Sequence, residues 1–326
     1  MFSVIITLYN KAHMIEGTLN SVLDQTFKDY EVIIIDDGST DNALEIINRN
    51  EKYSAFRIIK QLNQGASVAR NNGIANSKFN YVALLDGDDE WTPIFLETIS
   101  KAILEYPIAG IYGTSSWHKN ILTGEKSDGT PLKYKGKTQI FDFFENPVQM
   151  PHTSAIVLNK KIFNSVFVNG EGFPSGMKVC EDWACFYRIA FDSSVVYIGY
   201  PLGIRNNNVK GQITSASKLE RTYFLTHIIK FYNLTYTSWE NSKTKPKKYK
   251  RFLVFELRGR VIGYLITKDY NTLNNLLNGL IPGCRNELNK FELKIYSNLN
   301  LRYLSLCYIY YTKISWRINK FKNIFL

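Results

Sequence analysis

The sequence has few cysteines and lacks several motifs that would define other protein classes. Its four cysteines, at positions 180, 185, 284 and 307, include no CxxC pair, which argues against a disulfide framework and against a zinc site. The start, MFSVIITLYN, has no basic residues before its apolar run, so we expect no signal peptide and a cytoplasmic location. The late apolar run at 304–311 is far shorter than the roughly 20 residues of a membrane-spanning helix. No GxGxxG motif follows the first apolar run, which argues against a NAD-dependent oxidoreductase.

Positive charge is concentrated in the last third of the chain. Residues 1–216 hold 20 Lys and Arg against 23 Asp and Glu, whereas residues 217–326 hold 20 against 6, a net charge of +14. A basic segment beside a mildly acidic body predicts an anionic partner, either a membrane surface or nucleic acid. The overall composition, 45% hydrophobic and 21% charged, is that of a globular protein.

Strands and helices alternate in the first hundred residues. Continuous apolar runs predict strands at 2–9, 31–37, 56–61 and 81–89, and helical spacing predicts helices at 14–26, 40–50 and 67–77. Strands that are apolar on both faces indicate a mostly parallel sheet with helices on both sides. Polar clusters follow these strands at 7–10, 36–39, 63–65 and 86–89. Because ligands bind at the carboxyl ends of strands in such sheets, these clusters predict one site.

The rest of the chain divides into an irregular middle and a basic helical end. A strand is predicted at 154–159 and a helix at 181–191, with turn-rich stretches at 123–136 and 164–176. From about residue 218, Lys and Arg alternate with aromatic and aliphatic residues in predicted helices at 221–234 and 249–266, joined by an exposed basic linker at 238–251. We therefore predict an α/β domain at 1–216 and a basic amphipathic helical region at 217–326.

Three acidic positions suggest specific chemistry. Asp86-Gly87-Asp88 places two carboxylates around a glycine, an arrangement that suits Mg²⁺ or Mn²⁺, which takes few protein ligands and completes its shell with water and phosphate oxygens. Asp37, before the flexible Gly38, could accept a hydrogen bond from a nucleotide base. Asp182, at a predicted helix start, could act as a general base.

Each of these positions also has a purely structural interpretation. The DGDD segment could be a solvated turn or a calcium-like loop, and Glu181 with Asp182 could simply cap a helix. Arg70 could pair with a carboxylate at a helix surface. His152 could be a core histidine or a contact to an acceptor, and Pro151 with the flanking polar residues favours a loop and hence the second.

Several motifs occur in an order that resembles the bacterial glycosyltransferase family 2. They are TLYN (7–10), SVLDQTFKDYEVIIIDDGSTD (21–41), NQGASVARNNGI (63–74), LLDGDDEW (84–91) with Pro93, and Glu181-Asp182-Trp183. The resemblance covers residues 1 to about 110 strongly, continues to about 215, and is absent beyond. It implies the GT-A fold, a Rossmann-like α/β architecture, for residues 1–216.

The resemblance also implies roles for particular residues. It implies that Asp182 is the general base of an inverting transfer. We place Glu181, Trp183 and His152 on the acceptor side. Asp88, with Asp86, holds the divalent cation, Mn²⁺ or Mg²⁺. The remaining positions surround the nucleotide sugar: Thr7, Tyr9, Asn10, Asp37, Asn63, Gly65, Arg70, Asp86, Gly87 and Arg205. The family often has a mobile loop with a basic residue or histidine in the region of 201–217. This chain has Arg205 and Lys210 there but no histidine.

The implied partners are a UDP-sugar donor and a saccharide acceptor, linked to polyprenyl diphosphate in enzymes that build O-antigen or capsule. The basic region then fits the inner face of a bacterial cell membrane, on which the protein would be peripheral. Nucleic acid fits less well, since no nucleic-acid-binding motif accompanies the charge. The main rival is a non-catalytic membrane-binding protein that keeps a sugar-nucleotide fold, and the intact Asp88 and Asp182 argue against it. The sequence does not indicate an oligomeric state.

Overall fold

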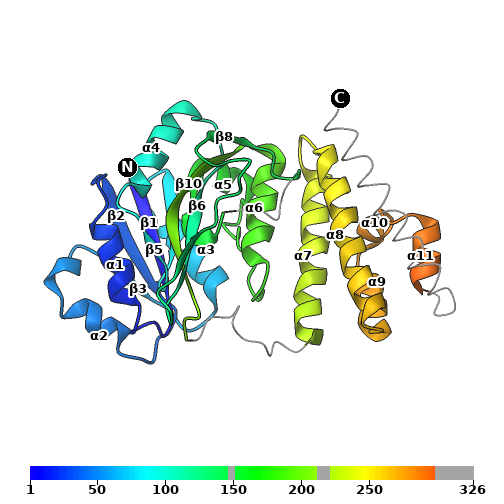
Figure 1. The fold of residues 1–326 in the computed structure, drawn as a ribbon, viewed down its shortest axis with the longest axis horizontal. Coiled ribbons are helices and arrows are strands. Elements are labelled where there is room, and N and C mark those ends of the chain that lie inside the picture. Colours follow the sequence, from blue (N-terminus) through cyan, green and yellow to red (C-terminus); the bar gives the residue numbers. More distant parts are fainter. Residues whose placement is uncertain (146–150, 211–220, 298–326) are drawn as a thin grey trace. The chain divides into compact units, whose positions relative to one another are not determined.

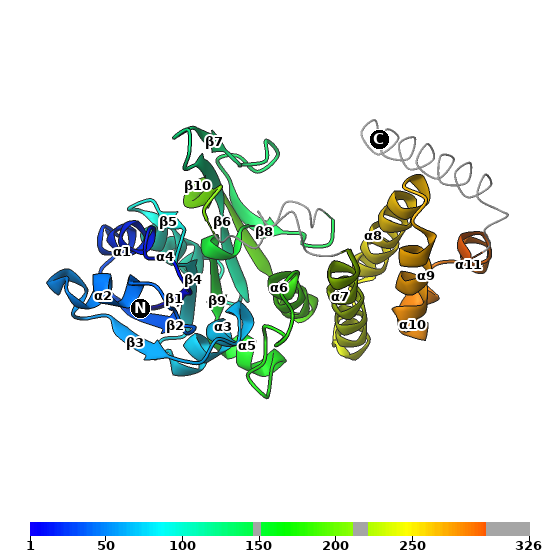
Figure 2. The ribbon, with the colours of Figure 1, turned by 90° about the horizontal axis from the view of Figure 1, so that it is seen from below.

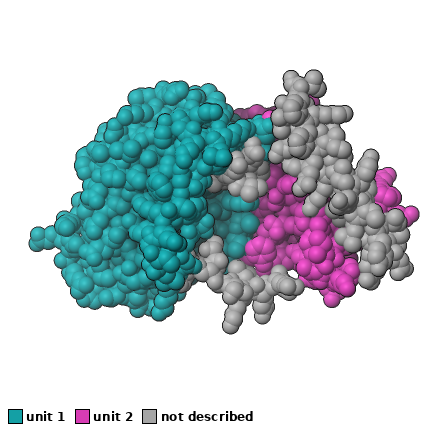
Figure 3. All heavy atoms as spheres, viewed as in Figure 1, with its two compact units in different colours: residues 1–219 teal, residues 220–326 magenta. Residues whose placement is uncertain are grey.

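The structure is a computed structural model that describes residues 1–145, 151–210 and 221–297. The chain divides into two compact units, Met1–Leu219 and Glu220–Leu326 (Figure 3). The boundary expected between residues 216 and 217 lies outside the described residues.

Unit 1 is an α/β fold built on one twisted sheet (Figure 1). Its strands are β1 (Phe2–Leu8), β2 (Tyr30–Asp36), β3 (Arg57–Lys60), β4 (Tyr81–Asp86), β5 (Glu90–Trp91), β6 (Ile111–Asn120), β7 (Lys126–Asp128), β8 (Thr138–Phe141), β9 (Ile156–Asn159) and β10 (Val195–Asn207). Its helices are α1 (Ile15–Leu23), α2 (Ala43–Asn48), α3 (Ala66–Asn76), α4 (Phe95–Glu105), α5 (Lys160–Val166) and α6 (Glu181–Asp192), with 3-10 turns η1 (Glu51–Tyr53) and η3 (Thr153–Ala155).

The sheet has the strand order β3-β2-β1-β4-β9-β6-β10-β5, with β7 paired to β6 and β8 to β10. β1 runs parallel to β2 and β4, β2 runs parallel to β3, and β10 runs parallel to β6, while β9 is antiparallel to both β4 and β6. The predicted α/β class with a mostly parallel sheet is therefore confirmed. The carboxyl ends of β1, β2 and β4 lie at one edge.

Helices cover both faces of this sheet (Figure 2). Apolar side chains of α1, α2 and α4 join one core cluster with Val4, Ile6 and Ile34. On the opposite face α3 lies directly against β1. The closest approach is at Gly73, where an added Cβ would come within 2.2 Å of Ile5 Cγ2. This close approach places the rest of α3, including Arg70, beside the carboxyl ends of the central strands.

The long strands β6 and β10 were not predicted from the sequence. Their apolar pattern is interrupted: β6 buries Thr114, Ser115 and Ser116, and β10 contains Pro201 between two shifts of register. These two strands form the half of the sheet that borders β9.

Unit 2 is helical, as the sequence predicts. Its helices are α7 (Arg221–Asn241), α8 (Lys247–Ile266), α9 (Tyr270–Gly279), α10 (Pro282–Arg285) and α11 (Lys290–Ser297). Leu253, Leu257 and Val261 line a buried face of α8 at helical spacing. None of the described helices combines the length and the apolar character needed to cross a membrane.

The expected exposed linker at 238–251 is wrong, because most of that segment is helical. α7 continues to Asn241 and α8 begins at Lys247. The connection is short because aromatic residues anchor it: Trp239 lies 6.0 Å from the ring of Tyr249 and donates its indole N–H to the Pro246 carbonyl. Lysines dominate the composition here, but the packing of these rings determines the local structure.

Candidate active site

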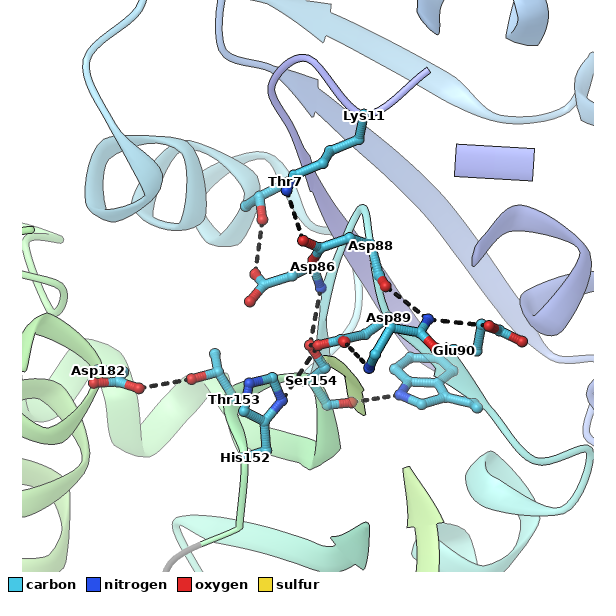
Figure 4. Close-up of polar contacts among 12 residues, drawn as sticks. Thr7, Lys11, Asp86, Asp88, Asp89, Glu90, His152, Thr153, Ser154 and Asp182 are labelled. Atoms are coloured by element: carbon cyan, nitrogen blue, oxygen red, sulfur yellow. Dashed lines mark hydrogen bonds and ion pairs between the residues drawn. The ribbon is translucent and has the colours of Figure 1, made fainter. Parts of the chain in front are cut away.

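The end of β4 is joined to the end of β1 by side-chain and backbone contacts. Thr7 Oγ1 donates to Asp86 Oδ1 at 2.9 Å, and the backbone N–H of Gly87 donates to the Thr7 carbonyl at 2.9 Å. A Cβ at position 87 would lie 2.9 Å from that carbonyl oxygen, so only glycine allows this approach. The DGDD segment is thereby fixed against β1 (Figure 4).

Asp37, at the end of β2, organises the loop that precedes α3. Its carboxylate accepts hydrogen bonds from Gln61 Nε2 and from the backbone N–H groups of Gln64 and Gly65, each at 2.8 Å. Gly65 has a φ of +88°, which favours glycine. Asp37 is only 4% exposed, whereas Asn63 on the same loop is exposed. The carboxylate expected to contact the base therefore also holds this loop in place.

Asn10 connects the loops after β1 and β2. It has a φ of +52°, and its side-chain oxygen accepts from the backbone N–H groups of Thr40 at 2.7 Å and Asp41 at 3.3 Å. Ser39 Oγ accepts in turn from the Asn10 backbone N–H. Tyr9, immediately before, is 47% exposed. The loops that would surround a nucleotide thus support one another, and Tyr9 leaves an aromatic face open to solvent.

Arg70 is a buried bridge between two distant acidic segments. Its guanidinium donates to Asp86 Oδ1 at 2.9 Å and to Glu181 Oε1 at 3.1 Å, and the side chain is 6% exposed. Burial alone would lower the pKa of Arg70, but neighbouring carboxylates, led by Asp86, more than offset it and raise that pKa. The same pairing outweighs burial at Asp86 and lowers the pKa of its carboxyl. Arg70 is therefore a permanent internal cation.

The three aspartates of the DGDD segment have different partners. Asp88 Oδ2 forms an ion pair with Lys11 Nζ at 2.7 Å. Asp89 is 2% exposed and accepts from Ser154 Oγ at 2.6 Å and from the backbone N–H of Asn206 at 2.9 Å. Burial and the nearby aspartates raise the pKa of Asp88, which Lys11 counteracts, and raise that of Asp89 well above its usual range.

His152 lies beside this segment, immediately before η3. Its Nδ1 is 3.3 Å from Asp89 Oδ2, and one potential ligand atom from each of Asp86, Asp89 and His152 lies within 4.8 Å of the others. Burial, followed by the charge of Arg205, lowers the pKa of His152 to about 4. The imidazole is therefore neutral at neutral pH and can act as a hydrogen-bond acceptor or a metal ligand.

Glu181 and Asp182 begin α6, where the helix dipole favours negative charge. Asp182 Oδ2 accepts from Thr153 Oγ1 at 2.9 Å and Oδ1 accepts from the backbone N–H of Trp183 at 2.7 Å. Burial and the charge of Asp182 raise the pKa of Glu181 to about 6, although Arg70 opposes that shift. Trp183 stacks on Tyr187 with ring centroids 6.2 Å apart.

Arg205 lies on a strand and not in a loop. It belongs to β10 and is opposite His118 of β6 in the register. Residues 201–207 pair with β6, so Arg205 does not lie in a loop of the kind that the family often has in this region. Residues 211–217 lie outside the described part of the chain.

Sequence reasoning missed Lys11, Asp89, Thr153, Ser154 and Asn206. Each of them is within two positions of a residue that was assigned, so the motifs bring the right segments to the site. The missing signal is long-range: Asn206 and Asp89 are 117 positions apart, and Ser154 and Asp89 are 65 apart. Pairings of this length are not encoded in local spacing.

Comparison with known proteins agrees with this geometry. Residues 3–167 match the family model described as "Glycosyl transferase family 2". The chain belongs to glycosyl transferase family 2.

Two curated relatives illustrate the extent of the likeness. The uncharacterized glycosyltransferase YibD of Escherichia coli K12 is 46% identical over 104 residues, which cover 32% of this chain and 30% of YibD. The uncharacterized glycosyltransferase alr2836 of Nostoc sp. PCC 7120 is 32% identical over 197 residues, 58% of this chain and 59% of alr2836. The chain thus covers less than two thirds of the length of either relative.

The crystal structure of S. aureus TarS residues 1–349 in complex with UDP-GlcNAc is similar in fold. Its TM-score is 0.73 at 17% identity, and the likeness covers 94% of this chain and 91% of that one. The GT-A fold that the family 2 motifs imply is thereby confirmed.

The buried bridge leads to a stability prediction. Arg70→Met keeps much of the volume but removes the guanidinium, which also lies over the Phe173 ring, and leaves Asp86 and Glu181 without their cation. We expect a loss of about 3–5 kcal/mol in the free energy of unfolding, measured by urea unfolding followed by tryptophan fluorescence. As a control, Arg49→Met removes a pair whose side chains are 65% and 70% exposed and changes stability by less than about 1 kcal/mol. Equal effects of the two substitutions would contradict the bridge.

Proposed function

We propose that this family 2 protein transfers a sugar from a UDP-sugar to a hydroxyl group of a saccharide acceptor, with inversion at the anomeric carbon. The observation that carries the proposal is the Arg70 bridge. It joins Asp86, of the segment expected to bind the donor, to Glu181, beside the expected base, although Glu181 lies 111 positions from Arg70 in the sequence. Donor-side and acceptor-side groups therefore belong to one site.

The donor side is formed by the loops at the carboxyl edge of the sheet. We assign the nucleotide to the region bordered by Thr7, Tyr9, Asn10 and the Asp37-centred loop, with Arg205 on the β10 side. Backbone amides and a partly exposed aromatic ring are suitable groups for a base and ribose. The sugar diphosphate then extends toward the DGDD segment.

The acidic edge fits a divalent cation, Mn²⁺ or Mg²⁺. Asp86 and Asp88 supply hard oxygen donors, and their side chains are 25% and 11% exposed. When bound, the cation would neutralise charge that develops on the departing UDP. Lys11, which pairs with Asp88, brings a further positive charge to the same region and can interact with phosphate oxygens.

Asp182 is the general base in this proposal. Glu181 is committed to Arg70, whereas each oxygen of Asp182 accepts a single hydrogen bond and retains a lone pair for the acceptor. The acceptor oxygen forms its bond to the anomeric carbon on the face opposite to UDP, and the bond from that carbon to the phosphate oxygen breaks with its electrons. The hydroxyl proton moves to Asp182.

The activity is tested by UDP release. Purified protein with a panel of UDP-sugars, Mn²⁺ or Mg²⁺ and extracted lipid-linked acceptor should release UDP with one preferred sugar, and EDTA should abolish release. Asp88→Asn should lower turnover about 100-fold. Asp29→Asn is the control, since Asp29 lies before β2 at the opposite edge of the sheet and should keep full activity. Release that is insensitive to EDTA and to Asp88→Asn would reject the cation assignment.

The base is tested separately. Asp182→Asn keeps the shape of the side chain and its contact with Thr153 but cannot accept the proton, so kcat should fall by about 10²–10⁴. UDP-sugar should still raise the Tm, because donor binding does not use this carboxylate. Asp192→Asn, an exposed aspartate at the other end of α6, is the matched control. An Asp182→Asn protein with normal kcat would rule out this role.

We further propose that unit 2 brings the enzyme to the cytoplasmic face of a bacterial cell membrane, where the acceptor is a polyprenyl-diphosphate-linked saccharide for O-antigen or capsule. Exposed basic side chains gather around the start of α8: Lys243, Lys245, Lys247, Lys248 and Arg251. Lys247, Arg251 and Phe255 follow one another at i, i+4 and i+8, and Phe255 is 55% exposed. A basic helical face with an exposed aromatic ring suits an anionic lipid surface.

Vesicle binding tests this location. Lys247→Glu with Arg251→Glu should weaken binding to phosphatidylglycerol-containing vesicles by at least about 30-fold, because each basic residue near such a surface contributes roughly 1 kcal/mol. Arg49→Glu with Lys52→Glu makes the same change of charge on an exposed part of unit 1 and should leave binding close to wild type. If both pairs weaken binding equally, only net charge matters and unit 2 is not the membrane-binding face.

A further inference from the structure

His152 is held rigidly at the edge of the DGDD segment. Pro151 packs onto Gly113 of β6, where a Cβ would come within 2.3 Å of the proline ring. The His152 carbonyl accepts from the backbone N–H of Ala155 at 2.8 Å, which starts the η3 turn. The imidazole therefore projects from a fixed backbone toward Asp86 and Asp89 (Figure 4).

Asp89 is placed to orient this imidazole. Its carboxylate is almost fully buried, and it already accepts from Ser154 Oγ and from the backbone N–H of Asn206. His152 is a third neighbour of this carboxylate, with its Nδ1 atom 3.3 Å from Asp89 Oδ2. A carboxylate at this distance favours the tautomer that carries its proton on Nδ1, which leaves Nε2 with its lone pair. Nε2 makes no hydrogen bond or ion pair within the described part of the chain.

We propose that His152 is a nitrogen ligand of the divalent cation, alongside the carboxylate of Asp86, and that Asp89 is the positioning residue that orients its ring. This inference rests on the proposed function and adds a ligand to the two carboxylates named above. It also moves His152 from the acceptor side, where the sequence placed it, to the cation.

The distances suit a shared cation. Two ligands bound at about 2.1 Å lie at most about 4.2 Å apart. One potential ligand atom from each of Asp86, Asp89 and His152 lies within 4.8 Å of the others, which is close to the spacing of ligands on one ion. An imidazole beside carboxylates also favours a transition-metal ion such as Mn²⁺ or Co²⁺ over Mg²⁺, which prefers oxygen ligands alone.

The experiment measures metal binding directly on the full chain. Mn²⁺ is titrated into the protein and followed by electron paramagnetic resonance, and the bound ion is examined by electron spin-echo envelope modulation for coupling to an imidazole ¹⁴N. Wild type should show the coupling. His152→Gln should lose it and bind Mn²⁺ at least 10-fold more weakly. His118→Gln changes a histidine on β6 and should keep both the coupling and the affinity.

Asp89→Asn separates orientation from ligation. It should weaken Mn²⁺ binding about 10- to 100-fold while a ¹⁴N coupling remains at saturating Mn²⁺. Wild type without any ¹⁴N coupling would overturn the proposal, and this result requires no variant to fold. A coupling that survives in His152→Gln would also overturn it. Either result combined with EDTA-sensitive UDP release would leave the proposed transferase function standing, so the two hypotheses fail separately.

Discussion

The ion pairs of Arg70 are the constraint on which the rest of the site depends. Carboxylates from β4 and from the start of α6 meet in a buried region, where like charges destabilise one another. Arg70 comes from a third element, α3, and pairs with Asp86 and Glu181 at once. α3 packs closely against β1 because residue 73 is a glycine without a Cβ. The position of the Arg70 guanidinium beside Asp86 and Glu181 therefore depends on the packing of α3 against β1.

The acidic side chains of the site have different charged and hydrogen-bonding neighbours. Arg70 holds Asp86 ionised and pairs with Glu181, Lys11 pairs with Asp88, and Asp89 accepts hydrogen bonds from two donors. Neighbouring carboxylates in different environments have pKa values that are pushed apart. Asp86 and Asp89 shift in opposite directions for this reason. One short acidic segment can therefore serve both ligand binding and structure.

Sequence reasoning located the first half of the fold because β1, β2 and β4 are continuous apolar runs that are followed by polar clusters. It failed for β6 and β10, because the buried threonine and serines of β6 and the proline of β10 hide the strand pattern. The motifs predicted which segments meet at the edge. They could not predict the pairs Lys11–Asp88 or Arg70–Glu181, because each joins residues brought together only by tertiary packing.

Asp89 shows why the last acid of the DGDD segment belongs to the site although it faces the interior. Its carboxylate joins three parts of the chain: Ser154 of η3, the backbone of Asn206 on β10, and the ring of His152. A buried carboxylate is tolerated only when such donors satisfy it. β10, one of the two strands that the sequence did not predict, is thereby tied to the acidic edge. A displacement of β10 would remove a hydrogen bond from Asp89, and the orientation of His152 would change with it.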